Sequence, residues 1–118
     1  MKLPKTPRAK LVKLLDIEWA RIIKRDGKCA KCGETKNLHA AHIFSRVAKS
    51  VRWDLDNGIP LCFYHHLRWG HQNPMLFSKF ATKYLGEEKM LALEQRQAQV
   101  KKWSLAEMEC LLKLYQQH

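Results

Sequence analysis

Apolar residues recur at helical spacing near the start of the chain. Between them, Lys and Arg supply much of the remaining surface. The pattern predicts an amphipathic helix over residues 9–26. The pair Asp26-Gly27 ends it, because glycine readily takes the left-handed conformation that follows a helix. Residues 1–8 are basic, contain two prolines, and are expected to form a mobile arm that can lie on phosphates. The apolar positions of the helix are Leu11, Leu14, Leu15, Ile17, Trp19, Ile22 and Ile23.

Residues 74–117 have the same helical periodicity and are expected to form the C-terminal helices. One helix is predicted over residues 75–84, and a glycine at position 86 ends it. A second is predicted over residues 87–102. It has acidic residues in its first turn and Lys101 and Lys102 in its last, as the helix dipole favours.

A last helix is predicted to begin after Ser104 and to run to about Gln116. Ser104-Leu-Ala-Glu107 has the form of a capping box, in which each end residue satisfies a backbone N–H group of the other. The lone cysteine of this segment, Cys110, is interpreted as a small core residue. The other core positions expected here are Met90, Leu91, Leu93, Trp103, Leu105, Met108, Leu111, Leu112 and Leu114.

Between these helical parts, two short apolar runs have the composition of strands. They are residues 37–43 and residues 59–61, with a turn at Asp56-Asn57-Gly58 between them. Pro60 suits only an edge position, because it has no N–H group to donate. A helix should then run from His65 to near Gly70. The chain is therefore expected to be an α+β protein, a mainly helical small domain built around a ββα unit, and 118 residues suit a single domain.

Charge and length narrow the classes of partner. The net charge is +11, which points to a polyanionic partner, most often nucleic acid, although solubility or an anionic membrane surface would also suit it. No apolar run approaches the roughly 20 residues of a membrane span. The first residues lack the apolar core of a signal peptide. We therefore expect no membrane partner and a cytoplasmic location, where paired cysteines indicate a metal more often than a disulfide.

Two ligand pairs of equal spacing predict a structural zinc site. Cys29-Ala-Lys-Cys32 is followed about thirty residues later by Cys62-Phe-Tyr-His65. Two intervening residues let both donors of a pair converge on one tetrahedral ion. His66 would compete with His65 for the ion. The alternative is that these are buried or redox-active residues that never meet.

The order of three further residues resembles that of the HNH, or His-Me finger, nucleases. His42, Asn57 and His66 follow one another in a ββα unit around a zinc knuckle, and the resemblance covers residues 29–71. It implies a ββα-metal core and a single HNH endonuclease domain over residues 1–118.

The chain also resembles the phage NinG/Rap recombination proteins, over most of its length. The shared features are a helix ending in Arg-Asp, the cysteines, and the segments His42-Ile-Phe-Ser-Arg46, Arg52-Trp-Asp-Leu-Asp-Asn57 and Tyr84-Leu-Gly-Glu-Glu88.

The resemblance implies a role for each of these residues. His42 would be the general base, because a neutral imidazole accepts a proton near neutral pH. His66 would bind a catalytic divalent metal, kept apart from the zinc. Asn57 would bond across the loop and aim the His42 ring. Arg46 would clamp the scissile phosphate, because a guanidinium matches two phosphate oxygens.

The sequence departs from the family where many members carry a metal-binding Asp immediately before the base. Here that position is Ala41. His39 would supply the missing ligand if the strand bulges, and it would otherwise be a surface residue; His71 and Asp56 are weaker candidates. An all-histidine site favours Mn²⁺, Co²⁺, Ni²⁺ or Zn²⁺ over Mg²⁺.

Two functions follow from these features. The first is a metal-dependent DNA endonuclease that nicks or cuts duplex or branched DNA and leaves 5′-phosphate ends. The NinG/Rap likeness implies recombination in a bacterial or phage-infected cell, with a recombination protein as a partner. A double-strand cut would need a homodimer or two successive nicks. The second is a non-catalytic zinc-knuckle module that binds nucleic acid. Trp53 and Trp69 would either stack on a base or pack in the core.

Overall fold

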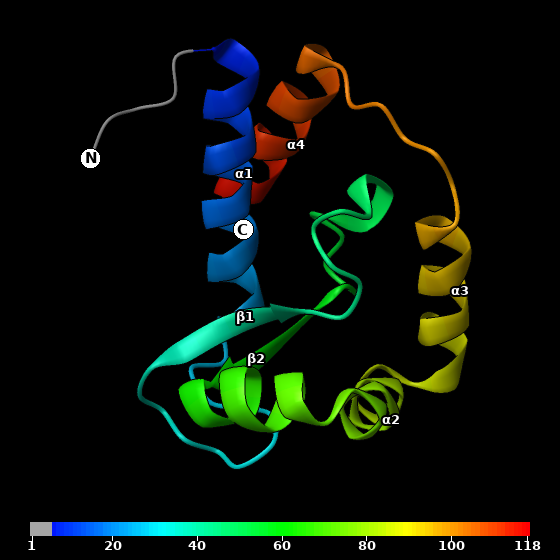
Figure 1. The fold of residues 1–118 in the computed structure, drawn as a ribbon. Coiled ribbons are helices and arrows are strands. Elements are labelled where there is room, and N and C mark those ends of the chain that lie inside the picture. The colour runs from blue at the N-terminus through cyan, green and yellow to red at the C-terminus, as the bar shows by residue number, and fades with distance from the viewer. Residues whose placement is uncertain (1–5) are drawn as a thin grey trace.

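The computed structural model describes residues 6–118, and within them the chain forms an α+β fold (Figure 1). The first five residues of the expected basic arm lie outside this range. The last two, Pro7 and Arg8, belong to the first helix. The elements in order are α1 (Pro7–Ile23), β1 (Leu38–His42), the 3₁₀ helix η1 (Lys49–Val51), β2 (Gly58–Cys62), the π-helix η2 (Tyr64–Gly70), α2 (Pro74–Leu85), α3 (Glu87–Gln97) and α4 (Leu105–Gln116).

Helix α1 begins two residues before its predicted start. Thr6 caps it by accepting a hydrogen bond from the Ala9 N–H, and a proline at the first helical position has no N–H that needs a partner. Four of its predicted core residues are buried. Leu14 and Ile17 are instead 44% and 53% exposed, because only one side of the helix is covered.

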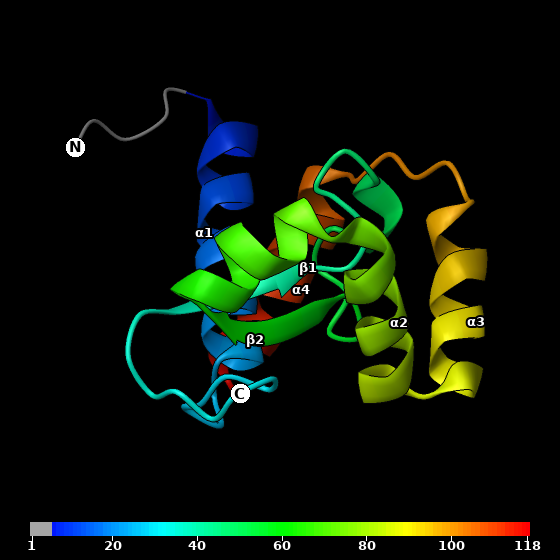
Figure 2. The ribbon, with the colours of Figure 1, turned by 60° about the horizontal axis from the view of Figure 1, so that its bottom comes forward.

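Strands β1 and β2 pair antiparallel and form a two-stranded sheet. Their register places His39 opposite Leu61 and His42 opposite Gly58, with no bulge. Pro60 is tolerated because each strand has one free edge. Helix α1 lies against one side of this sheet and η2 against the other (Figure 2).

The two sides of the sheet belong to two apolar clusters. One joins the sheet to α2, α3 and the loop before β1, and consists of Cys29, Ala41, Val51, Ile59, Leu61, Cys62, Ala81, Met90 and Leu93. The other joins α1 to α4 and consists of Leu15, Trp19, Ile22, Ile23, Trp53, Met108, Leu112 and Tyr115. Trp53, one of the two tryptophans considered for base stacking, is therefore a core residue.

The C-terminal helices follow the prediction in number but not in every boundary. Helix α3 ends at Gln97, so the prediction that Lys101 and Lys102 close it is wrong; Arg96 occupies its last turn. Residues 98–103 form an extended link, which carries the chain from α3 to α1, where α4 packs (Figure 1). The capping box at Ser104 is present as predicted. Among the helices of residues 6–118, none is long and apolar enough to span a membrane.

Several predicted core residues of α3 and α4 are exposed instead. Leu91, Leu105 and Leu114 are 57%, 41% and 57% exposed, and Cys110 is also exposed. The reason is that each helix packs on one side only, so a single stripe of each is covered.

Gly58 lets α1 lie directly on the sheet. A Cβ atom at this position would lie 2.6 Å from Trp19 and 2.7 Å from Ile23. We therefore expect Gly58→Ala to lower the free energy of unfolding by about 1–3 kcal/mol, the usual cost of overpacking. Urea denaturation measures this change. At a position with room for a Cβ atom, Gly→Ala raises stability because it restrains the unfolded chain. An unchanged or higher stability of Gly58→Ala would therefore contradict the close packing.

Candidate functional site

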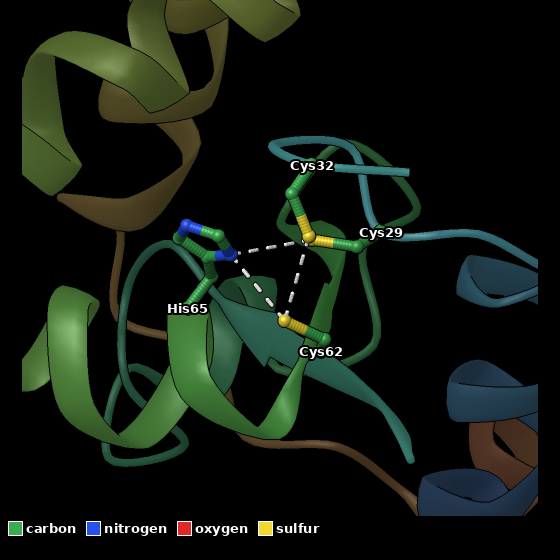
Figure 3. A group of neighbouring side chains, drawn as sticks. All are labelled: Cys29, Cys32, Cys62 and His65. Atoms are coloured by element: carbon green, nitrogen blue, oxygen red, sulfur yellow. Dashed lines mark hydrogen bonds between the residues drawn. The ribbon is translucent and has the colours of Figure 1, made fainter. Parts of the chain in front are cut away.

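The predicted zinc ligands meet in one cluster. Cys29 and Cys32 come from the loop before β1, Cys62 from the end of β2 and His65 from η2 (Figure 3). Their four donor atoms lie within 4.8 Å of one another. In residues 6–118 this is the only group of three or more His, Cys, Asp or Glu side chains that converges in this way.

The spacing of the donors fits a tetrahedral ion. Zinc bonds of about 2.3 Å to sulfur and about 2.0–2.1 Å to nitrogen place neighbouring ligands roughly 3.6–3.8 Å apart. The Sγ atoms of Cys32 and Cys62 are 3.8 Å apart, and His65 Nδ1 lies 3.9 Å from Cys29 Sγ and 3.3 Å from Cys62 Sγ. Three sulfurs and one imidazole make a closed set typical of structural zinc, so the cluster can hold such an ion.

The surroundings of Cys29 and His65 favour the protonation states that bind a metal, which are the thiolate and the neutral imidazole. Burial disfavours the Cys29 thiolate, but backbone N–H groups directed at the sulfur outweigh it and lower the pKa of Cys29. A backbone hydrogen bond from Glu34 favours the Cys32 thiolate, but desolvation and the sulfurs of Cys29 and Cys62 together outweigh it and raise the pKa of Cys32. Burial, and then the nearby Lys31, lower the pKa of His65 and keep its ring neutral. A metal ion would take the place of the thiol protons.

The helix predicted to open at His65 is a π-helix, and it separates two adjacent histidines. His65 joins Cys29, Cys32 and Cys62, whereas His66 lines a different site. Gly70 permits this turn, since a Cβ atom there would lie 2.8 Å from the His65 carbonyl oxygen. π-Turns occur often at functional sites.

The second site is an open hollow of about 530 Å³ at the free edge of β1, between α1 and η2. It contains three of the four residues given catalytic roles from the sequence: His42, Arg46 and His66. His71 also lines it. The remaining lining residues are Asp16, Trp19, Ala20, Ala40, Ile43 and Ser45. We call it the histidine hollow.

His42 lies between α1 and the loop that follows β1. Its ring stacks on Trp19 at 4.0 Å, and its Nε2 is 3.1 Å from the carbonyl oxygen of Arg52. A carbonyl only accepts, so Nε2 carries the proton of the neutral ring and Nδ1 keeps a free lone pair. Burial lowers the pKa of His42, and the charges of Arg46 and Arg52 lower it further against the opposing effects of the Arg52 carbonyl and Asp16. At neutral pH the ring is a neutral acceptor.

Asn57 does not line the hollow but fixes the loop behind it. Its side chain is fully buried. Its Nδ2 donates to the carbonyls of Phe44 and Val51, each at 2.9 Å, and its Oδ1 accepts from the Phe44 N–H at 2.7 Å. It thus joins both ends of the loop that precedes Arg52, whose carbonyl accepts the hydrogen bond from His42.

Loss of this side chain should be costly. We expect Asn57→Ala to lower the free energy of unfolding by about 2–4 kcal/mol, because the Phe44 N–H and carbonyl lose their partner and the Val51 carbonyl keeps only the Asp54 N–H. Urea denaturation gives the value. The matched control is Asn73→Ala, which removes one bond, to the Trp69 carbonyl, at a partly exposed site and should cost about 1 kcal/mol or less. Equal losses of stability in both variants would contradict the inference that Asn57 holds the two ends of this loop together.

His39 and His66 form a pair beneath the hollow. Their Nδ1 atoms are 2.9 Å apart, although β1 has none of the bulge expected to bring His39 there. Burial, and then the charges that His39, His71 and His42 would carry, lower the pKa of His66 to about 4. The separation suits a hydrogen bond, and also two nitrogen ligands at right angles on an ion at about 2.1 Å.

Of the two weaker ligand candidates, His71 lies near His66 and Asp56 does not. His71 is near His66, with 5.1 Å between the ring centroids. Asp56 forms an ion pair with Arg96 at 3.3 Å.

Trp69, the other tryptophan considered for base stacking, is half-buried. Its ring lies edge-on to His65, on the same side of η2 as the four predicted zinc ligands.

The acidic residue of the hollow was not predicted from the sequence. Asp16 accepts two hydrogen bonds from the Arg52 guanidinium, at 3.0 and 2.7 Å, and one from the Trp53 indole at 2.8 Å. The signal available was an acidic residue placed between Leu15 and Ile17 in a basic helix. Its partners are nearly forty residues away, so spacing alone could not identify them.

No family model, curated protein or solved structure matches this chain.

Proposed function

We propose that this protein is a metal-dependent DNA endonuclease. One observation carries the proposal: a neutral histidine with a free lone pair (His42), a cation (Arg46) and a metal-binding type of side chain (His66) line one open hollow. Phosphodiester hydrolysis needs a base for water, positive charge around the phosphate and a Lewis acid beside the leaving 3′ oxygen. The hollow contains side chains suited to each of these needs.

The roles follow from the contacts. His42 Nδ1 would accept a proton from water while Nε2–H stays bonded to the Arg52 carbonyl. Arg46, exposed at the rim, would bind the phosphate. His66 and His39 would hold the divalent ion, and imidazole nitrogens suit Mn²⁺, Co²⁺, Ni²⁺ or Zn²⁺ better than Mg²⁺. That ion would supply stabilisation of charge on the leaving oxygen.

The surroundings of the hollow suit a polyanion. Among the residues that the structure describes, Asp16 is its one acidic lining residue, and the Arg52 guanidinium neutralises it at 2.7 Å. The chain as a whole carries a net charge of +11, which would attract DNA over a long range.

A second candidate is a non-catalytic module that binds nucleic acid and is stabilised by zinc. The observation in its favour is that both histidines of β1 have partners within the protein. His42 stacks on Trp19, and His39 bonds to His66. Structural histidines make the same contacts, so an assay of activity has to separate the two candidates.

The deciding experiment is a cleavage assay on supercoiled plasmid and on a four-way junction. Each substrate is incubated with Mg²⁺, Mn²⁺, Ni²⁺ or no added metal. We expect nicking that requires a divalent ion and leaves 5′-phosphate ends, and preference for the junction would support a role in recombination. Binding of both substrates without cutting under any metal would instead favour the binding module.

A further inference from the structure

A second hollow has Arg52 among its lining residues. It measures about 480 Å³ and is formed by the N-terminal end of α1, η1 and the link before α4. Its floor is apolar and includes Trp53, Trp103 and Met108. Cations surround this floor: Arg8, Lys49, Arg52, Lys101 and Lys102. We call this the basic hollow.

Three of these cations have no carboxylate partner among residues 6–118. Asp16 neutralises Arg52, and Glu107 neutralises Lys101. Within residues 6–118, Arg8, Lys49 and Lys102 form no ion pair. Within the described part of the chain, no acidic side chain lines the basic hollow. Its uncompensated positive charge therefore suits an anionic ligand.

Trp103 is a partly exposed aromatic side chain that the protein holds in place. Its Nε1 donates to the Lys49 carbonyl at 2.9 Å, and its ring meets Trp53 edge-on at 5.3 Å. Among residues 6–118, one cation lies over its ring, the Lys101 ammonium at 4.9 Å from the centroid, which Glu107 also binds. An aromatic ring among phosphate-binding cations is the arrangement by which proteins bind single strands.

Arg52 connects the two hollows. It lines the basic hollow, its carbonyl oxygen accepts the His42 hydrogen bond, and its guanidinium donates to Asp16 of the histidine hollow. A strand whose phosphate lies beside His42 would therefore have the basic hollow as its next neighbour.

We propose that the basic hollow binds a single-stranded segment of nucleic acid, with one base stacked on Trp103 and phosphates on Arg8, Lys49 and Lys102. A base in an intact duplex is stacked on its neighbours and cannot reach this ring. The substrate class is then DNA with an unpaired segment next to the scissile phosphate. This last step rests on the proposed nuclease function, whereas the binding does not.

The test measures binding of a labelled oligothymidylate and of a labelled duplex by fluorescence anisotropy, without added divalent metal. Trp103→Leu should weaken oligothymidylate binding about 5- to 150-fold, which corresponds to one lost stacking contact, and should leave duplex binding much less affected. A thermal melt of the variant checks its fold. Equal losses for both ligands, or none, would overturn the proposal.

A second pair of variants tests the charges without touching Trp103. Lys49→Gln with Lys102→Gln should reduce the slope of log affinity against log salt by about 1.4 for the single strand. The Lys49 carbonyl that holds Trp103 is retained. The matched control, Lys79→Gln with Lys83→Gln, removes the same charge from exposed positions on α2. Equal slopes in the two double variants would overturn the proposal.

The experiments distinguish failure of the proposed nuclease function from failure of the proposed single-strand binding. If the oligothymidylate depends on Trp103 and the two lysines but no substrate is cut, the basic hollow stands and the nuclease function falls. If DNA is cut but these variants bind the single strand as the wild type does, the basic hollow falls and the nuclease function stands.

Discussion

Cys29→Ser is expected to unfold this protein. A serine hydroxyl is a poor zinc ligand, and zinc contributes about 10–16 kcal/mol where it holds a small domain together. A domain of this size has a net stability of only about 5–15 kcal/mol. Cys29 and Cys62 also belong to the apolar cluster that joins the sheet to α2 and α3, so losing the ion would loosen that cluster. Circular dichroism should show loss of the cooperative thermal transition, and metal analysis should show loss of about one zinc per chain.

Cys110→Ser is the matched control for this change. Cys110 is exposed on α4 and lies outside the metal cluster, so its replacement should alter stability by no more than about 0.5 kcal/mol. It should also leave the zinc content unchanged. A Cys29→Ser protein that melts cooperatively without zinc would contradict the structural role of the cluster.

The metal cluster was predictable because its signal is local. Two pairs of ligands with equal spacing define it, and the order of two strands and a helix brings the pairs together. The capping box at Ser104 is local in the same sense, because its hydrogen bonds join residues three apart. Such features depend on a few residues at fixed spacing, so they can be predicted almost completely from the sequence.

The histidine hollow was predictable only in part, because its geometry depends on contacts between distant segments. His42, Arg46 and His66 follow one another in sequence, but their common hollow exists because α1 and η2 lie on opposite sides of β1. The Asp16–Arg52 pair joins residues 36 apart. Likewise, helical periodicity does not say which side of α4 is covered, which is why Cys110 was wrongly placed in the core.

His42→Ala is expected to abolish most of the proposed cleavage while DNA binding persists. Removing a general base typically costs about 10²–10⁴-fold in rate. The cations that would bind DNA, Arg46 among them, are unchanged, so the affinity should stay close to that of the wild type. Plasmid nicking and anisotropy measure the two quantities, and a thermal melt reports any loss from the stacking on Trp19.

The matched control is His118→Ala, an exposed histidine outside the hollow. It should cut DNA as the wild type does. Full cleavage by His42→Ala would exclude His42 as the base. Equal loss of cleavage in both variants would mean that the effect is not specific to the hollow.

The pH dependence of cleavage would show whether His42 acts as a base through its neutral form. Burial lowers the pKa of His42 below its ordinary value of 6.5, so kcat/KM should hold at neutral pH and fall once the pH drops below that pKa. The Arg46 charge also lowers this pKa. Arg46→Gln should therefore move the acid limb to higher pH, besides weakening phosphate binding. A limb that stays fixed or moves to lower pH would mean that the titrating group is not His42, because only a base near Arg46 gains affinity for its proton when that charge is removed.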